Sequence, residues 1–131
     1  PVYDYRYFLF KRKNKGMTFK SLIIAREVIK FKKKILRIVD FIGNVKEFLY
    51  MRNATDRILV NECFEYIDIL TCNINPKYLI KSGFTLKKKN DENIIPNYFQ
   101  PYLKKNVSIN YVLSKKKIIL FKADADQDTP R

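Results

Sequence analysis

The stretch Ile35-Leu-Arg-Ile-Val-Asp-Phe-Ile-Gly-Asn44 decides the fold of this chain, because two patterns of hydrophobicity meet inside it. Residues 35–42 are an apolar run interrupted by Arg37 and Asp40, which is typical of a strand. Gly43 ends that run, and the apolar residues that follow recur at helical spacing: Val45, Phe48, Leu49, Ile58 and Leu59. We therefore expect a strand followed directly by a helix over residues 44–61, with Asn44 as its N-cap.

Upstream of this junction the sequence predicts a meander of three antiparallel strands. Residues 3–10 are an aromatic-rich run with strand composition, and residues 11–16 form a polar turn. Residues 17–31 fit either a strand or a short helix by period alone, and their β-branched content favours a strand. A charged turn over residues 32–34 then leads into the strand of residues 35–42.

Downstream, a strand over residues 64–70 precedes a short helix that Asn75 caps, Pro76 opens and Gly83 closes. The remaining chain predicts a short strand from Phe84, a polar loop over 87–93, an aromatic turn-rich segment over 95–102, and a hairpin of strands 108–113 and 118–121. The order β-β-β-α-β-α-β-β-β predicts an α+β fold with a mixed, largely antiparallel sheet and two helices.

Composition narrows the chemistry that this chain can perform. The 131 residues suit a single domain over 1–131, which we read as the C-terminal portion of a longer protein since it begins at Pro1. The absence of histidine removes the usual general base and metal ligand, so we expect no metal. Cys63 and Cys72 are expected to be reduced, small buried hydrophobes. No apolar run reaches the ~18 residues of a membrane span, and with no export signal we expect a cytoplasmic protein.

The chain is strongly basic, with a formal net charge of +14. This charge predicts attraction to an anionic partner such as nucleic acid, a phosphorylated cofactor or an acidic glycan. Its lysines gather in four clusters, each at a predicted turn: 11–15, 32–34, 87–89 and 115–117. The clusters fit either solvated hairpin ends or a binding patch.

Three short matches and the order of elements point to a family. The matches are Ile-Val-Asp-Phe-Ile-Gly at 38–43, Tyr-Ile-Asp at 66–68 and Lys-Ser-Gly-Phe at 81–84. Together they resemble the later two-thirds of the GNAT (N-acetyltransferase) superfamily. The closing run 122–128 is similar to the C-terminal ends of GNAT-like proteins that accompany bacterial surface-polysaccharide genes. The resemblance implies a GNAT-like fold in which two central strands splay apart and hold acyl-CoA in the gap.

The resemblance also implies where the cofactor lies. The pyrophosphate is expected on the loop that opens the helix after the first central strand, where a helix N-terminus offers unpaired N–H groups to an anion. This assigns cofactor binding to five residues, namely Phe41, Gly43, Asn44, Val45 and Asn73. The loop has one glycine where the family pattern has two small residues, and simple turn chemistry is the alternative for Gly43.

Catalytic residues follow from the same resemblance and from the lack of histidine. A general base for an acceptor amine has to be a carboxylate, and Asp40 and Asp68 stand on the two central strands. Each is equally well explained as a buried structural carboxylate. Tyr78 is the candidate acid that protonates the departing thiolate, although Leu79 holds the position that many family members give to tyrosine.

The expected function is transfer of an acyl group from acetyl-CoA or another acyl-CoA to a small amine, including that of an amino-sugar in surface-polysaccharide biosynthesis. One alternative is a non-catalytic basic module that binds nucleic acid or an acidic glycan, because of the +14 charge. Another is a degenerate GNAT scaffold, because the glycine loop and the tyrosine both depart from the family pattern.

Overall fold

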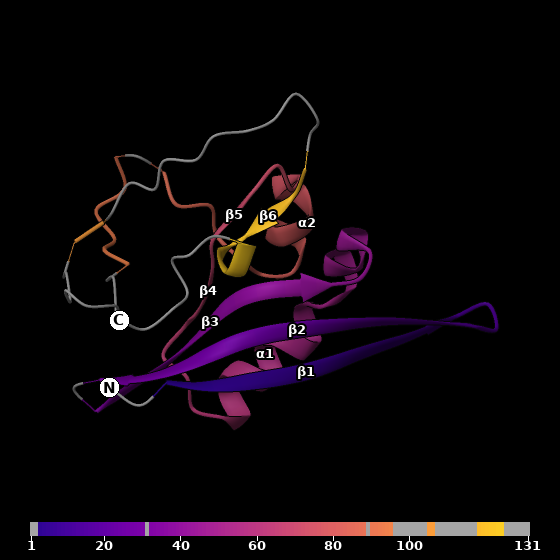
Figure 1. Ribbon diagram of the computed structural model, residues 1–131, viewed down its shortest axis with the longest axis horizontal. Coiled ribbons are helices and arrows are strands. Elements are labelled where there is room, and N and C mark those ends of the chain that lie inside the picture. The colour runs from indigo at the N-terminus through magenta and orange to yellow at the C-terminus, as the bar shows by residue number, and fades with distance from the viewer. Residues whose placement is uncertain (1–2, 31, 89, 96–104, 107–117, 125–131) are drawn as a thin grey trace.

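The computed structural model describes residues 3–30, 32–88, 90–95, 105–106 and 118–124, and it is an α+β structure built on a mixed four-stranded sheet (Figure 1). In chain order its elements are β1 (Tyr3–Asn14), β2 (Met17–Lys30), β3 (Lys33–Ile42), the 3₁₀ helix η1 (Val45–Tyr50), α1 (Arg52–Asn61), β4 (Ile67–Ile69), β5 (Thr71–Cys72), α2 (Pro76–Lys81), β6 (Leu120–Phe121) and the 3₁₀ helix η2 (Lys122–Asp124).

The sheet has the order β1-β2-β3-β4, with β1, β2 and β3 antiparallel and β4 parallel to β3. This confirms the predicted meander and its mixed, largely antiparallel character. The first hairpin is longer than predicted, because residues 11–14 continue β1 and pair with residues 17–20. Only Lys15 and Gly16, at φ 46° and 79°, make the turn. The hairpin extends as an arm well beyond the other elements (Figure 1).

The predicted single helix over residues 44–61 is divided into η1 and α1, which meet at Met51. Phe48 in η1 and Met51 at the division are both fully buried. A 3₁₀ turn places residues three apart on the same side, so both side chains enter the core together. Asn44 is the N-cap, as predicted, and accepts the N–H of Lys46 at 3.0 Å.

The strand that follows α1 is shorter than the predicted strand 64–70. The helix after it begins and ends as expected. β4 covers only Ile67–Ile69, and the chain leaves the sheet before β5. Asn75 caps α2 by accepting the N–H of Lys77 at 3.0 Å, and Gly83 follows α2 with φ 95°. The crossover from β3 through η1 and α1 to the parallel β4 is the strand-helix-strand centre predicted from the sequence.

The C-terminal predictions are only partly met. Residues 84–88 form no strand, because the N–H of Phe84 closes the end of α2 by donating to Leu79 O at 3.1 Å. Strand 108–113 and most of the aromatic segment 95–102 lie outside the described residues. Within 118–121, β6 pairs with β5 in an antiparallel manner.

The main core lies between the sheet and the helical segments. It joins buried side chains from β2, β3, η1 and the later chain: Ile23, Ala25, Leu36, Ile38, Phe41, Phe48, Met51, Phe64, Ile74 and Phe121. Both cysteines are free thiols, as predicted. The expectation of burial is wrong for Cys63, which is exposed, because it occupies a left-handed turn at φ 55° directly after α1. Cys72 is half-buried in β5.

Candidate functional site

β3 and β4 run side by side for only a short distance. Their parallel register joins residues 36–38 to residues 67–69 and then stops. At the same point β3 carries an extra residue against β2, because Ala25 pairs with Ile38 while Ile24 pairs with Asp40. Such a bulge bends a strand and re-aims its side chains. β4 is the edge strand of the four-stranded sheet, so the prediction of two central strands is wrong for the strand that carries Asp68. β3 and β4 part beyond Ile38, and β5 takes β6 as its partner.

The C-terminal segment lies against β3 beyond this point. The ring of Phe41 packs on Phe48, with centroids 4.4 Å apart, and on Phe121 at 6.2 Å. β6 and η2 are both neighbours of β3. The predicted cofactor residue Phe41 thus has its ring in the core, at 6% exposure, so only its backbone can face a ligand.

Two backbone N–H groups at this junction are held by carboxylates of their own loops. Phe41 donates its N–H to Asp40 Oδ1 at 2.7 Å, and Phe121 donates its N–H to Asp124 Oδ2 at 2.6 Å. Asp40 is half-buried and directly follows the bulge.

Gly43 is the point where the chain turns from β3 into η1. Its φ is 142°, and an added Cβ would lie 2.7 Å from Ser21 Oγ, so only glycine fits. The Ser21 hydroxyl beneath it is buried and has no hydrogen-bond partner among the described residues.

The turn at Gly43 begins η1, whose first amides already have acceptors. Glu47 donates its N–H to Asn44 O at 2.8 Å, and the Asn44 side chain holds the N–H of Lys46. Gly43 and Asn44 are exposed, and Val45 is half-buried. The structure thus brings these three predicted cofactor residues together, beside Phe41 and at the end of β3.

Glu47 fastens this turn to the first hairpin. Arg12 binds it with two hydrogen bonds of 2.8 Å, from Nε and Nη2. The Arg12 guanidinium also lies over the rings of Phe19, at 4.4 Å, and Tyr50, at 4.1 Å. The hydrogen bonds that Arg12 donates to the Glu47 carboxylate raise the pKa of Arg12 above its ordinary value. Sequence reasoning missed this cluster, because its members are far apart in the chain and no local pattern joins them.

The other predicted site residues stand on β4 and on the segment that follows it. Asp68 faces Arg37 across the parallel register and accepts Nε at 2.8 Å and Nη2 at 2.6 Å, with the two side chains 12% and 8% exposed. Both of its carboxylate oxygens are thus occupied. Asn73, at φ 61°, donates its side-chain N–H to Ile118 O at 2.7 Å.

Tyr78 lies on α2, half-buried against the main core. α2 packs on η1, and the Ser82 hydroxyl at its C-cap donates to Phe48 O. The Ser82 carbonyl accepts the hydroxyl of Thr55 on α1 at 3.0 Å. Tyr78 is therefore on a helix that is tied to η1 and α1, the helical segments that follow Gly43.

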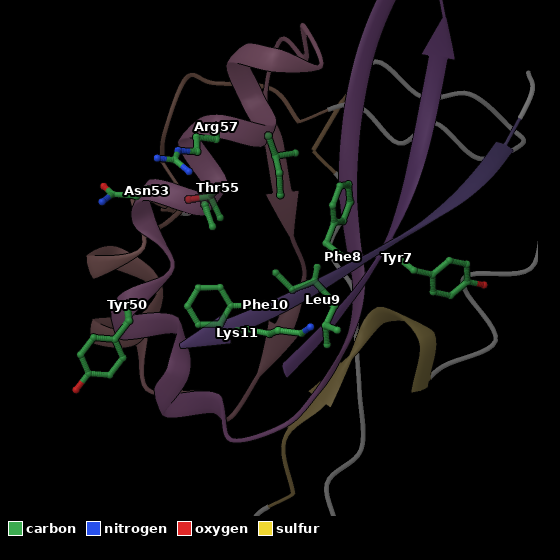
Figure 2. Close-up of a pocket in the computed structure, with 12 residues that line it drawn as sticks. Tyr7, Phe8, Leu9, Phe10, Lys11, Tyr50, Asn53, Thr55 and Arg57 are labelled. Atoms are coloured by element: carbon green, nitrogen blue, oxygen red, sulfur yellow. The ribbon is translucent and has the colours of Figure 1, made fainter. Parts of the chain in front are cut away.

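A separate groove of about 630 Å³ lies between β1 and the η1–α1 segment. Phe8, Phe10 and Ile58 give it an apolar wall, and Arg57 lies at its rim. Figure 2 shows Phe10 turned toward the helical side, while Tyr7 points to the opposite side of the strand. None of the predicted catalytic or cofactor residues lines this groove.

Comparison with known proteins found no matching family model, no similar curated protein and no similar solved structure. Among the residues that the structure describes, the helices are all too short or too polar to cross a bilayer. The same residues include no group of three or more acidic or cysteine side chains placed to hold a metal ion.

Proposed function

We propose that this chain is the acyl-CoA-binding part of a GNAT-like N-acyltransferase. The observation that carries the proposal is the coincidence, at one point of β3, of the bulge and the end of pairing with β4. Two parallel strands that part in this way leave backbone groups of the first strand free to bind an extended ligand. Ligands of open α/β sheets bind beyond the carboxyl ends of the strands for the same reason.

The N–H of Phe41 is the first group that such a ligand would take. It donates to the neighbouring Asp40 side chain at 2.7 Å, and a rotation of that side chain breaks this hydrogen bond. A carbonyl of the pantetheine arm then accepts the N–H, and the Asp40 carboxylate becomes available as a base for the incoming amine. Asp68 is a weaker candidate base, since Arg37 occupies both of its oxygens.

The loop of Gly43, Asn44 and Val45 is proposed to hold the pyrophosphate. Its residues lie at the carboxyl end of β3, and the buried Ser21 hydroxyl beneath Gly43 lacks a partner among the described residues. The net charge of +14 adds attraction for the cofactor's phosphates. Tyr78, on the helix packed against η1, is the proposed acid for the thiolate.

The segment of β6 and η2 has to adjust when the cofactor binds. Phe121 is buried against Phe41 next to the proposed slot. An acyl chain therefore lies over this segment or displaces it. Hydrogen exchange at residues 118–124 should change on addition of acetyl-CoA, which locates the binding site independently of affinity.

Isothermal titration of the whole chain with acetyl-CoA tests the proposal, with ATP as a control for unspecific phosphate binding. We expect acetyl-CoA to bind in the micromolar range, and more tightly than ATP. Gly43→Ala should weaken this binding, whereas Gly16→Ala, at the other end of the hairpin arm, should not. No binding at millimolar acetyl-CoA, or equal affinity for ATP, contradicts the proposal.

If cofactor binding is found, the acceptor is sought with a panel of amines that includes amino-sugars. The readout is release of the free CoA thiol. Asp40→Asn should retain cofactor affinity and lose turnover, because the side chain acts on the amine. Binding without turnover on any amine would leave the degenerate scaffold as the function of this chain.

A further inference from the structure

The hairpin arm presents a face on which tyrosines and lysines follow one another. In an antiparallel pair, alternate residues of each strand point to one side. On β1 this side carries Tyr5, Tyr7, Leu9, Lys11 and Lys13, and on β2 it carries Lys20. We call the two tyrosines and three lysines the lysine-tyrosine face; Leu9, 56% exposed, lies between Tyr7 and Lys11. The face is on the side away from Arg12, which is held by Glu47 on the other side of the sheet.

The lysines of this face have no acidic partner among the described residues, and all three are exposed. Lys11 and Lys20 are directly opposite each other in the register of β1 and β2. Like charges so placed repel, since their Cβ atoms are only about 4.5–5.5 Å apart. A bound anion relieves this repulsion. Lys13 stands two residues further along β1, about 7 Å away.

The tyrosines give the face a second property. Tyr7 is 65% exposed and Tyr5 is 45% exposed. The Arg26 guanidinium lies 5.1 Å from the centroid of the Tyr5 ring and donates a hydrogen bond of 2.7 Å to the Tyr5 hydroxyl. Exposed aromatic rings beside a row of cations are the elements with which proteins bind single-stranded nucleic acid, by stacking bases and neutralising phosphates.

We propose that the lysine-tyrosine face binds single-stranded nucleic acid, with bases stacked on Tyr7 and Tyr5 and the phosphates running toward Lys11, Lys20 and Lys13. The arm extends beyond the other elements, so a strand can approach the lysines without meeting the rest of the molecule (Figure 1). None of these residues belongs to β3, η1 or α2, although Tyr7 lies in one cross-strand row with Ile24 and the proposed base Asp40.

Fluorescence anisotropy of the whole chain with a labelled poly(dT) of about 20 nucleotides, longer than the site of a single binding fold, tests this proposal. The triple variant Lys11→Ala/Lys13→Ala/Lys20→Ala should bind at least about tenfold more weakly and reduce the slope of log affinity against log salt by about 2. The control is Lys46→Ala/Lys77→Ala/Lys81→Ala, which removes the same charge from exposed positions on η1 and α2.

Tyr7→Ala distinguishes nucleic acid from other polyanions. Loss of one stacked base should weaken poly(dT) binding roughly 5- to 100-fold and leave the salt slope unchanged. Circular dichroism checks that the Tyr7→Ala variant is folded. We expect the fold to be unchanged, because the Tyr7 side chain is exposed. The proposal is overturned if the two triple variants weaken binding equally. It is also overturned if Tyr7→Ala has no effect, or if heparin, an acidic glycan, binds more tightly than poly(dT).

Discussion

Gly43 combines a positive φ with close contact to Ser21, and both features disfavour a side chain at this position. An added Cβ meets Ser21 Oγ at 2.7 Å and Ser21 Cβ at 3.0 Å, while φ is 142°. Gly43→Ala should therefore destabilise the fold by roughly 1–3 kcal/mol, as measured by urea unfolding. Gly16→Ala is the matched control, because Gly16 also has a positive φ, 79°, but open space around it. Equal losses in the two variants would show that the contact with Ser21 is unimportant.

The two carboxylates on β3 and β4 should respond differently to neutralisation. Asp68→Asn leaves Arg37 largely buried without its counter-ion, and a cost of roughly 3 kcal/mol is expected for breaking such a pair. Asp40→Asn keeps an acceptor for the N–H of Phe41 and should change stability by about 0.5 kcal/mol or less. Thermal and urea unfolding of both variants measure the difference. A larger loss for Asp40→Asn would reverse the roles that the geometry suggests.

At the scale of elements, the hairpin arm is anchored to η1 by the pair of Arg12 and Glu47. Glu47→Gln removes the charge that holds the guanidinium, so amide exchange in residues 10–12 and 19–21 should rise by roughly tenfold. Glu62→Gln is the control, because Glu62 is 38% exposed and contacts Arg6 at 3.2 Å. Because the pKa of Arg12 is raised in the folded protein, the contribution of its guanidinium to the anchor is fully present below the ordinary arginine pKa and is lost as pH rises through the higher folded pKa.

The loop after α2 contains a turn that should lose stability at acidic pH. The backbone N–H of Asn93 donates to Asp91 Oδ1 at 3.0 Å and lowers the pKa of Asp91 below its ordinary value of 3.8, with Lys87 assisting. Because the pKa of Asp91 is lowered in the folded protein, the ionised carboxylate stabilises the turn at pH values above its ordinary pKa. This stabilisation is lost as the pH falls through the lower pKa of the folded state. The NMR shift of the Asn93 amide should thus titrate with a midpoint below 3.8. Asp91→Asn should abolish that titration; a midpoint at or above 3.8 would contradict the hydrogen bond.

At the scale of the whole molecule, the charge of +14 opposes folding by self-repulsion. Salt screens this repulsion, since the screening length falls from about 30 Å at 0.01 M to about 8 Å at 0.15 M. The melting temperature should rise by about 5 °C over this range. Differential scanning calorimetry in sodium chloride measures it, and a melting temperature that falls with salt would show that ion pairs outweigh the repulsion.

The sequence alone was sufficient to predict the strands and helix ends that depend on interactions between residues close together in the chain. The aromatic and β-branched runs of β1, β2 and β3 predicted the meander, and the Asn75-Pro76 start and Gly83 end of α2 were confirmed. Backbone propensity, capping and left-handed glycine act within a few residues, so they are readable in the chain itself. For the same reason the sequence alone placed Phe41, Gly43, Asn44 and Val45 together, because they lie within five residues of the chain.

Tertiary structure decided what depends on partners far away in the chain. The register of β3 against both neighbours sets the bulge at Val39 and the separation of β4 from β3. The same long-range pairing joins Arg37 to Asp68, 31 residues apart, and Arg12 to Glu47, 35 residues apart. No periodicity records which strands become neighbours, because that choice is made by the free energy of the assembled core, to which all the elements contribute at once.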